Sequence, residues 1–205
     1  GQGLLVAADN DEITGKDCNS ATFRWSVPTF GAIEQTVRPL LAALPKAKRV
    51  YTITPQYVFG DGLLTAAKNI FKEKGIEHVG NSYHSLTEKE FSGYLTNALA
   101  AKPDVLLLLN FGAQSSDTLR QAVSFGLKQR MTIVVAWASG LEQFEALGPD
   151  ICEGIYLSAL PAASANRASC LSYQATGRFS SSARSLRRMA LRTAMAPSQR
   201  NGSGG

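Results

Sequence analysis

The feature that most constrains the fold is a unit that repeats between residues 49 and 137: an apolar strand, a polar loop and an amphipathic helix. The apolar runs expected to be strands are residues 49–54, 76–83, 104–110 and 132–137. Apolar residues at helical spacing fill the gaps between them. Strands that alternate with helices build a parallel sheet with helices on both faces. The pattern therefore predicts a three-layer, doubly wound α/β fold.

Further elements are expected on both sides of this repeat. Before it, residues 4–8 read as a short strand and residues 30–44 as a helix that Pro45 ends. After it, residues 141–148 read as a short helix and residues 154–160 as a last strand. The last two elements continue the same alternation of helix and strand.

Local signals predict where the helices inside the repeat start and stop. Gly75 is expected to end the first helix, because glycine readily takes the left-handed conformation found just after a helix. Thr87 and Glu90 have the spacing of a capping box, which predicts that the second helix starts there. Ser115 or Ser116 is expected to cap the third helix.

The net charge of +5 comes from the end of the chain. After position 160 there are seven Arg, no Lys and no acidic residue, so the remaining 14 basic and 16 acidic residues give residues 1–160 a net charge of −2. A basic tail can bind polyanions without specificity, but we interpret this one as an unfolded or aberrant end and expect no nucleic-acid partner.

No apolar run reaches the about 18 residues needed for direct membrane insertion. The first residues also lack the features of a signal peptide.

The chain offers little catalytic chemistry. Its two histidines are His78, within an expected strand and read as a core or edge residue, and His84, in a loop where a ligand-facing role stays open. No G-x-S-x-G motif, Walker motif or metal-ligand cluster is present, and the three cysteines match no metal pattern. Gly60 and Gly62 open a helix but lack the third glycine of a dinucleotide fingerprint. We therefore expect no catalytic residue, no cofactor, no metal and no enzyme activity.

Aromatic residues mark a candidate binding site. In an open parallel sheet, ligands lie beyond the carboxyl ends of the strands. Aromatic side chains fall at or just after those ends: Tyr57, Phe59, Tyr83, Phe111 and Trp137. Loops do not usually carry such side chains unless something covers them, so we expect a concave, aromatic-lined site with hydrogen bonds from Asn110 and Ser139. The predicted ligand-binding residues are Tyr57, Phe59, Asn110, Phe111, Trp137 and Ser139.

Several segments carry a family resemblance, in this order: GKDCNSATFRWS, YTITPQYVFGDG, HSLTEKEFSGYLTNALAAKPDVLLLLNFG and LRQAVSFGLK. Together they cover about residues 4–160 and resemble the type 1 periplasmic binding proteins, specifically the branched-chain amino acid and amide class of ABC-transporter substrate-binding proteins. That family has two similar lobes joined by three crossovers, and closure traps the ligand between them. The resemblance implies that this chain is a fragment that contains mainly the second lobe.

The resemblance also implies a division of the chain. Residues 1–24 would be a remnant of the first lobe with the crossover, and residues 25–160 the second α/β lobe. Residues 161–205 are rich in Ser, Ala and Arg and lose the family's apolar spacing, so we expect a poorly ordered tail there. A frameshifted or truncated reading frame explains this tail better than a new domain.

The implied function is that of the solute-binding component of an ABC importer, which works in the periplasm and docks onto a membrane permease. The solute would be small and polar or aromatic, of the amino acid, amide or carboxylate type. Phe59 stands where the family has an aromatic residue that packs on the ligand. The loop at 137–140 has no acid to pair an amino group, which favours a neutral, aromatic or carboxylate-bearing solute over a plain α-amino acid.

Two other functions stay open for the same strand ends: a flavodoxin-like enzyme and a ligand-sensing regulatory domain. In either case the ligand would lie at the same edge of the sheet. If the chain holds one lobe of a two-lobe receptor, we expect it to bind its solute weakly or not at all.

Overall fold

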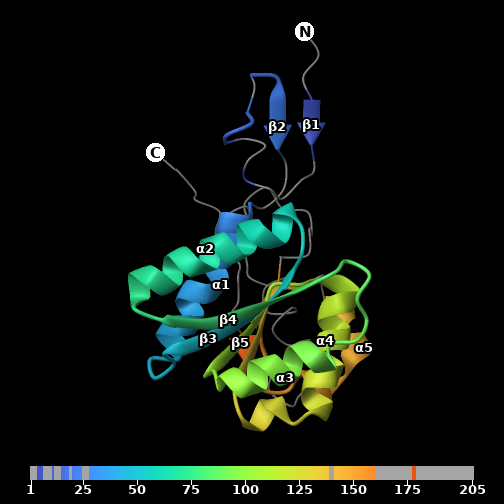
Figure 1. Cartoon of the computed structure of the whole chain (residues 1–205). Coiled ribbons are helices and arrows are strands. Elements are labelled where there is room, and N and C mark those ends of the chain that lie inside the picture. Colours follow the sequence, from blue (N-terminus) through green and yellow to red (C-terminus); the bar gives the residue numbers. More distant parts are fainter. Residues whose placement is uncertain are drawn as a thin grey trace, which may run out of the picture.

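The helices and strands follow the alternation expected from the sequence (Figure 1). This computed structural model describes residues 4–6, 11, 15–18, 20–24, 28–138, 141–159 and 177–178. The helices are α1 (Thr29–Ala43), α2 (Val58–Lys74), α3 (Ser92–Ala101), α4 (Gly112–Ser124), the 3-10 helix η2 (Leu127–Gln129), α5 (Leu141–Leu147) and α6 (Pro149–Cys152). The strands are β1 (Leu4–Val6), β2 (Thr22–Arg24), β3 (Arg49–Pro55), β4 (Glu77–His84), β5 (Val105–Leu108), β6 (Thr132–Ala138), β7 (Tyr156–Ala159) and β8 (Gly177–Arg178).

The main sheet has the strand order β4-β3-β5-β6-β7-β8. Neighbouring strands from β4 to β7 are parallel, and the two-residue β8 pairs antiparallel with β7. The doubly wound parallel sheet expected from the repeat is therefore confirmed. β8 lies within 161–205, the expected tail, and the rest of that range is outside the described residues. β1 and β2 form a separate parallel pair, which stands apart at the top of Figure 1.

Helices cover both faces of the main sheet. One core lies under α1 and α2, and the other lies under α3, α4 and α5. The side chains of β5 alternate between them: Leu106 and Leu108 join the core under α3 and α4, whereas Val105 and Leu107 join the core under α1 and α2. A strand buried on both faces has an unbroken apolar sequence. Each fully buried leucine stabilises the fold by about 2 kcal/mol.

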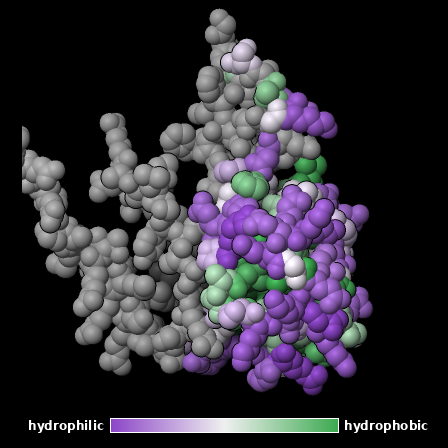
Figure 2. Space-filling model, turned by 90° about the vertical axis from the view of Figure 1, so that its left-hand side faces the viewer, coloured by the Kyte–Doolittle hydropathy of each residue, from purple (hydrophilic) through white to green (hydrophobic). Residues whose placement is uncertain are grey.

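The side of the molecule turned toward the viewer in Figure 2 is mostly hydrophilic over the described residues. On the outer surface of the helices, Arg38 of α1 binds Glu34 of the same helix and Glu73 of α2, at 2.6 and 2.7 Å from the Glu73 oxygens. The hydrogen bonds from Arg38 lower the pKa of Glu73 to about 2.

Within the part of the chain that the structure describes, no helix has both the length and the apolar character needed to cross a membrane.

The helix ends differ from the sequence expectations in two places. Gly75 has φ of 66° and ends α2 as expected. α3, however, starts at Ser92, so the capping box at Thr87 and Glu90 is a wrong prediction. The carboxylate of Glu88 accepts hydrogen bonds from the amides of its two following residues, at 3.0 and 3.1 Å. A side chain that satisfies neighbouring amides stabilises a turn in place of a helix.

The start of α4 is the second difference. This helix begins at Gly112, and no side-chain cap is present at its first turn. The hydroxyls of Ser115 and Ser116 donate to the carbonyl oxygen of Gly112, at 2.9 and 3.1 Å. Both serines therefore act as donors inside the first turn, and the expectation that one of them caps the helix is wrong.

The two histidines occupy different environments. His78 is half-buried on β4, with Nε2 2.8 Å from Thr52 Oγ1, which agrees with the expected structural role. His84 is only 1% exposed, and its ring packs edge-on against Phe91 and Tyr94, at centroid distances of 5.1 and 6.3 Å. The structure therefore does not support a ligand-facing His84.

The buried imidazole of His84 is held neutral. Its Nδ1 lies 2.8 Å from the carbonyl oxygen of Ser85, to which only an N–H can donate. In the neutral ring with this Nδ1–H, Nε2 carries no proton, and it is buried without a hydrogen-bond partner among the described residues. Burial lowers the pKa of His84 below its ordinary value of 6.5, and burial together with the charge of Lys68 does the same for the pKa of His78.

We expect acidification to destabilise the fold before the carboxylates titrate. Because the pKa of His84 is lower in the folded state, the unfolded chain binds more protons as the pH falls below 6.5. The free energy of unfolding should then fall by at most about 1.4 kcal/mol per pH unit for each such histidine. Urea unfolding between pH 7.5 and 5 measures this slope. His84→Phe removes one of the two histidine titrations and should reduce the slope, and an unchanged slope in the variant would contradict the assignment.

The start of α2 needs a glycine. A Cβ atom at Gly60 would lie 2.0 Å from the carbonyl oxygen of Pro55, at the end of β3. The contact is with backbone, so no side chain can move aside to relieve it. Gly60 directly follows Phe59, so this close approach lies next to a residue of the candidate site.

Gly60→Ala should therefore destabilise the chain by about 2 kcal/mol or more, as overpacking against a fixed backbone does. Gly93→Ala in α3 is the matched control, because a Cβ there meets nothing within 4 Å. The control should be neutral or stabilising by about 0.5 kcal/mol, since alanine favours the helix. Thermal and urea unfolding of both variants test this pair. Equal stability of the two variants would show that the approach at Gly60 is not tight.

Candidate functional site

The register of the central strands aligns the ends that carry the candidate site. Ile53 of β3, Leu108 of β5 and Val135 of β6 lie in one row across the sheet. β3 and β5 are adjacent although β4 follows β3 in the chain, so the direction of winding reverses between them. Ligands of doubly wound sheets bind outside the carboxyl ends of the strands at such a reversal. Phe59, in the first turn of the helix that follows β3, and Phe111, in the loop that follows β5, both lie at this reversal.

Four of the predicted site residues form one aromatic cluster: Tyr57, Phe59, Phe111 and Trp137. The ring of Phe59 is central, with its centroid 5.7 Å from Tyr57, 5.6 Å from Phe111 and 5.2 Å from Trp137. Phe111 and Trp137 meet Phe59 at 80° and 82°, the edge-to-face geometry that aromatic pairs favour. Phe59 is 9% exposed and Phe111 is 37% exposed, so Phe59 lies beneath rings that reach the surface.

A bulge in β6 turns Trp137 toward this cluster. Val135 pairs with Leu157 and Ala138 with Ala159, so β6 has one residue more than β7 in this stretch. Simple alternation would place Trp137 with Val135, in the core under α3 and α4. It packs instead against the core under α1 and α2, beside Phe59. Bulges redirect side chains in this way and are common next to functional sites.

The two polar residues of the predicted site do not join the cluster. Asn110 is fully buried, and its Nδ2 donates to Thr118 Oγ1 of α4 at 2.9 Å. Its Oδ1 is buried without a hydrogen-bond partner among the described residues. Asn110 therefore lies beneath the loop that carries Phe111, and Ser139 falls outside the described residues.

Residues that the sequence did not single out also shape this edge of the sheet. The side-chain amides of Gln114 and Gln143 donate to the loops after β4 and β5. Glutamines on amphipathic helices usually face water, and only their position in the turn after a binding loop could have marked them. Tyr83, which the sequence already marks as one of the aromatic residues at the strand ends, is 44% exposed and donates to Asp61 at 2.9 Å. Partial burial and this bond to Asp61 raise the pKa of Tyr83.

The aromatic side chains of this edge have the chemistry to contact an apolar group. In the described part of the chain, no group of three or more His, Cys, Asp or Glu side chains is arranged to hold a metal ion. The helices α2 and α4 both begin beside the cluster, at Val58 and Gly112. Helix N-termini favour negative charge, so an anionic group on the same ligand would be tolerated here.

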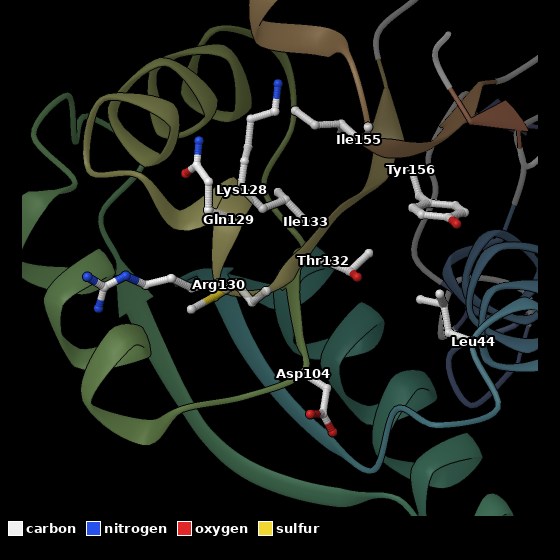
Figure 3. Close-up of a pocket in the computed structure, with 11 residues that line it drawn as sticks. Leu44, Asp104, Lys128, Gln129, Arg130, Thr132, Ile133, Ile155 and Tyr156 are labelled. Atoms are coloured by element: carbon white, nitrogen blue, oxygen red, sulfur yellow. The ribbon is translucent and has the colours of Figure 1, made fainter.

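A cavity of about 430 Å³ lies at the opposite edge of the sheet, where β5, β6 and β7 begin (Figure 3). Two of its charged side chains, Asp104 and Lys128, already serve the fold. Asp104 accepts from the amides of Lys48 and Arg49 at 2.7 and 2.9 Å, and Lys128 donates to the carbonyls of Asp150 and Ile151 at 2.8 and 3.3 Å. This cavity is remote from the aromatic cluster and offers no comparable set of free recognition groups.

Solved structures of transport receptors resemble this chain. An amino acid ABC transporter substrate-binding protein from Pseudomonas fluorescens Pf-5 has 64% sequence identity and a TM-score of 0.72, over 77% of this chain and 42% of that one. Two more share the fold. One is a branched-chain amino acid ABC transporter protein from Thermus thermophilus with bound valine (18% identity, TM-score 0.66, 77% of this chain and 41% of that one). The other is a solute binding protein from R. palustris in complex with benzoate (21% identity, TM-score 0.64, 76% and 43%).

This chain thus spans less than half the length of these similar proteins. A search of curated proteins found no match. The profile of one family, described as periplasmic binding protein, matches residues 2–188, which covers the aromatic cluster and both sheets. That is a family of binding proteins and not of enzymes. The resemblance read from the sequence is therefore confirmed, and the chain belongs to the periplasmic binding protein family.

Proposed function

We propose that this chain provides one lobe of the solute-binding receptor of an ABC importer, and that the aromatic cluster is its half of the ligand site. The observation that carries the proposal is the position of Phe59, which lies at the reversal in strand order and contacts Phe111 from the loop after β5 and Trp137 near the carboxyl end of β6. Residues 25–160 would form the second lobe and residues 1–24 a part of the first. The separate pairing of β1 and β2 supports this division.

The cluster favours a solute with a flat or branched apolar part. All four of its side chains are aromatic, and nearby Asp61 accepts a hydrogen bond from Tyr83. A solute amine would therefore have to compete for that carboxylate, whereas a solute carboxylate would be favoured by the starts of α2 and α4. Benzoate and valine, which similar proteins bind, each combine an apolar group with a carboxylate. Of these two chemistries, the aromatic carboxylate fits this edge better.

In the intact receptor, closure would bring the other lobe against the exposed side of the solute. A ligand drives closure only by binding the closed state more tightly than the open state. The closed receptor would then dock onto a membrane permease, and the family relationship supports a periplasmic location for this step. The present chain supplies contacts on one side of the solute, so its affinity should be low.

We expect benzoate to bind the 205-residue chain with a dissociation constant of about 1 mM or weaker, a binding free energy of about −4 kcal/mol. Amide NMR spectra recorded during a benzoate titration should shift at residues 57–60 and 110–113. Phe111→Ala should remove most of this response, because the variant lacks an exposed wall of the cluster.

Phe125→Ala is the matched control for this test. Phe125 is 46% exposed and follows the last residue of α4, at the end remote from the cluster. This variant should respond to benzoate as the unaltered chain does. Shifts centred on the cavity beside Asp104 would contradict the site, and micromolar or tighter binding would contradict the half-site interpretation.

A further inference from the structure

Two glutamine side chains join the loops at the carboxyl edge of the sheet. Nε2 of Gln143 in α5 lies 3.2 Å from the carbonyl oxygen of Gly112 and 2.6 and 3.0 Å from the hydroxyl oxygens of Ser115 and Ser116, so its two N–H groups are shared among three acceptors. Gln114 of α4 donates to the carbonyl oxygens of Ser85 and Leu86, at 3.1 and 2.7 Å, in the loop after β4. Together they connect the structural units that follow β4, β5 and β6.

The orientation of the Gln143 amide is determined by its partners. The carbonyl oxygen of Gly112 can only accept a hydrogen bond, so the NH₂ group of the amide must face it. The same oxygen also accepts from Ser115 and Ser116, which makes it a point where three donors converge. Such a network holds a peptide unit firmly when every donor is in place.

The held carbonyl belongs to the residue that directly follows Phe111. Gly112 directly follows Phe111 and has φ of 60°, a left-handed conformation that allows the sharp entry into α4. A change in the backbone dihedrals of Gly112 would alter the direction in which Phe111 leaves α4, and with it the contact of the Phe111 ring with Phe59. Since Phe111 is 37% exposed, packing alone does not prevent that movement.

α5 links this loop to Trp137. The helix begins shortly after β6, the strand whose bulge aims Trp137 at Phe59, and it packs on α4 (Figure 1). Phe111 and Trp137 both contact Phe59 but come from different strand ends. The bond from Gln143 to Gly112 therefore connects the unit that carries one ring to the unit that carries the other.

We propose that Gln143 is a positioning residue of the solute site. It holds the backbone at Gly112 and thereby keeps the Phe111 ring, like the Trp137 ring, in contact with Phe59. Gln114 extends this connection to the loop after β4. The role in solute binding rests on the proposed function above, whereas the role in fixing the ring geometry does not.

Gln143→Glu is the sharpest test, because it replaces the NH₂ group by an acceptor of the same shape. The hydroxyls of Ser115 and Ser116 would turn to donate to the new carboxylate, and the Gly112 carbonyl would lose all three donors. A negative charge at the start of α5 is favourable by itself, so global stability should change little. Gln143→Met removes the donor without adding charge and serves if the first variant does not fold.

Gln121→Glu is the matched control. Gln121 is also a glutamine of α4 that donates to a backbone carbonyl, that of Lys89, at 2.8 Å, and it accepts from the amide of Phe91 at 2.7 Å. Its partners lie in the loop before α3, away from the aromatic cluster. This substitution removes a comparable bond without touching Gly112.

Three measurements distinguish positioning from a general loss of structure: nuclear Overhauser contacts between the Phe59 and Phe111 rings, the melting temperature, and the benzoate titration. In Gln143→Glu we expect the ring contacts to weaken and benzoate affinity to fall about fivefold, as for the loss of one hydrogen bond, with the melting temperature nearly unchanged. Gln121→Glu should keep the ring contacts and the affinity.

Ring contacts that persist in both Gln143→Glu and Gln143→Met would overturn the proposal. If the unaltered chain shows no response to benzoate, the proposed function fails for this solute, yet the ring contacts still decide whether Gln143 holds Phe111. Weakened contacts in Gln121→Glu to the same degree would also overturn it, since the effect would then not be specific to the Gly112 peptide.

Discussion

The parallel register of β3, β5 and β6 is the constraint on which the rest of the structure depends. Because Ile53, Leu108 and Val135 share one row, the strands end at the same edge and their loops leave the sheet side by side. The register is in turn held by burial on both faces of β5, where a slip by one residue would move each side chain into the wrong core. Sheet, cores and candidate site are therefore consequences of one alignment, and the aromatic cluster forms without any long excursion of the chain.

Phe59 connects the fold to the site. It belongs to the core under α1 and α2, and it also supports the rings of Phe111 and Trp137 at the surface. The residue after it, Gly60, approaches the backbone of Pro55 at the end of β3 so closely that a Cβ atom there would clash. A residue with both roles couples stability to recognition: a change that lets the ring sink or tilt would alter the surface offered to a solute even if the sheet stayed intact. The hydrogen-bond network around Gly112 is proposed to act on the orientation of Phe111, which is the most exposed ring of the cluster at 37%.

The amino-acid sequence predicts the architecture well because burial dominates it. The run of leucines in β5 and the glycine after α2 each have one physical reading, and the structure agrees with both. The clustering of Tyr57, Phe59, Phe111 and Trp137 also followed from the rule that strand ends share an edge. The misses concern hydrogen bonds that compete locally. Glu88 satisfies nearby amides and so delays the start of α3, and Ser115 and Ser116 donate where capping would have them accept. The bulge that turns Trp137 depends on pairing with β7, which no local pattern records.

A one-sided site of this kind has a specific energetic consequence. Association costs a small molecule several kcal/mol of translational and rotational freedom, and edge-to-face contacts with aromatic rings contribute only about 1 kcal/mol each beyond the buried area. Contacts from one lobe therefore yield little net affinity, whereas a second surface adds contacts after that entropy has already been lost. The second set of contacts consequently makes the larger difference to the bound state and drives closure. For this argument to hold, the first surface must already be rigid. If the Phe111 ring became ordered only on binding, the entropy it lost would offset the small binding free energy that one lobe provides.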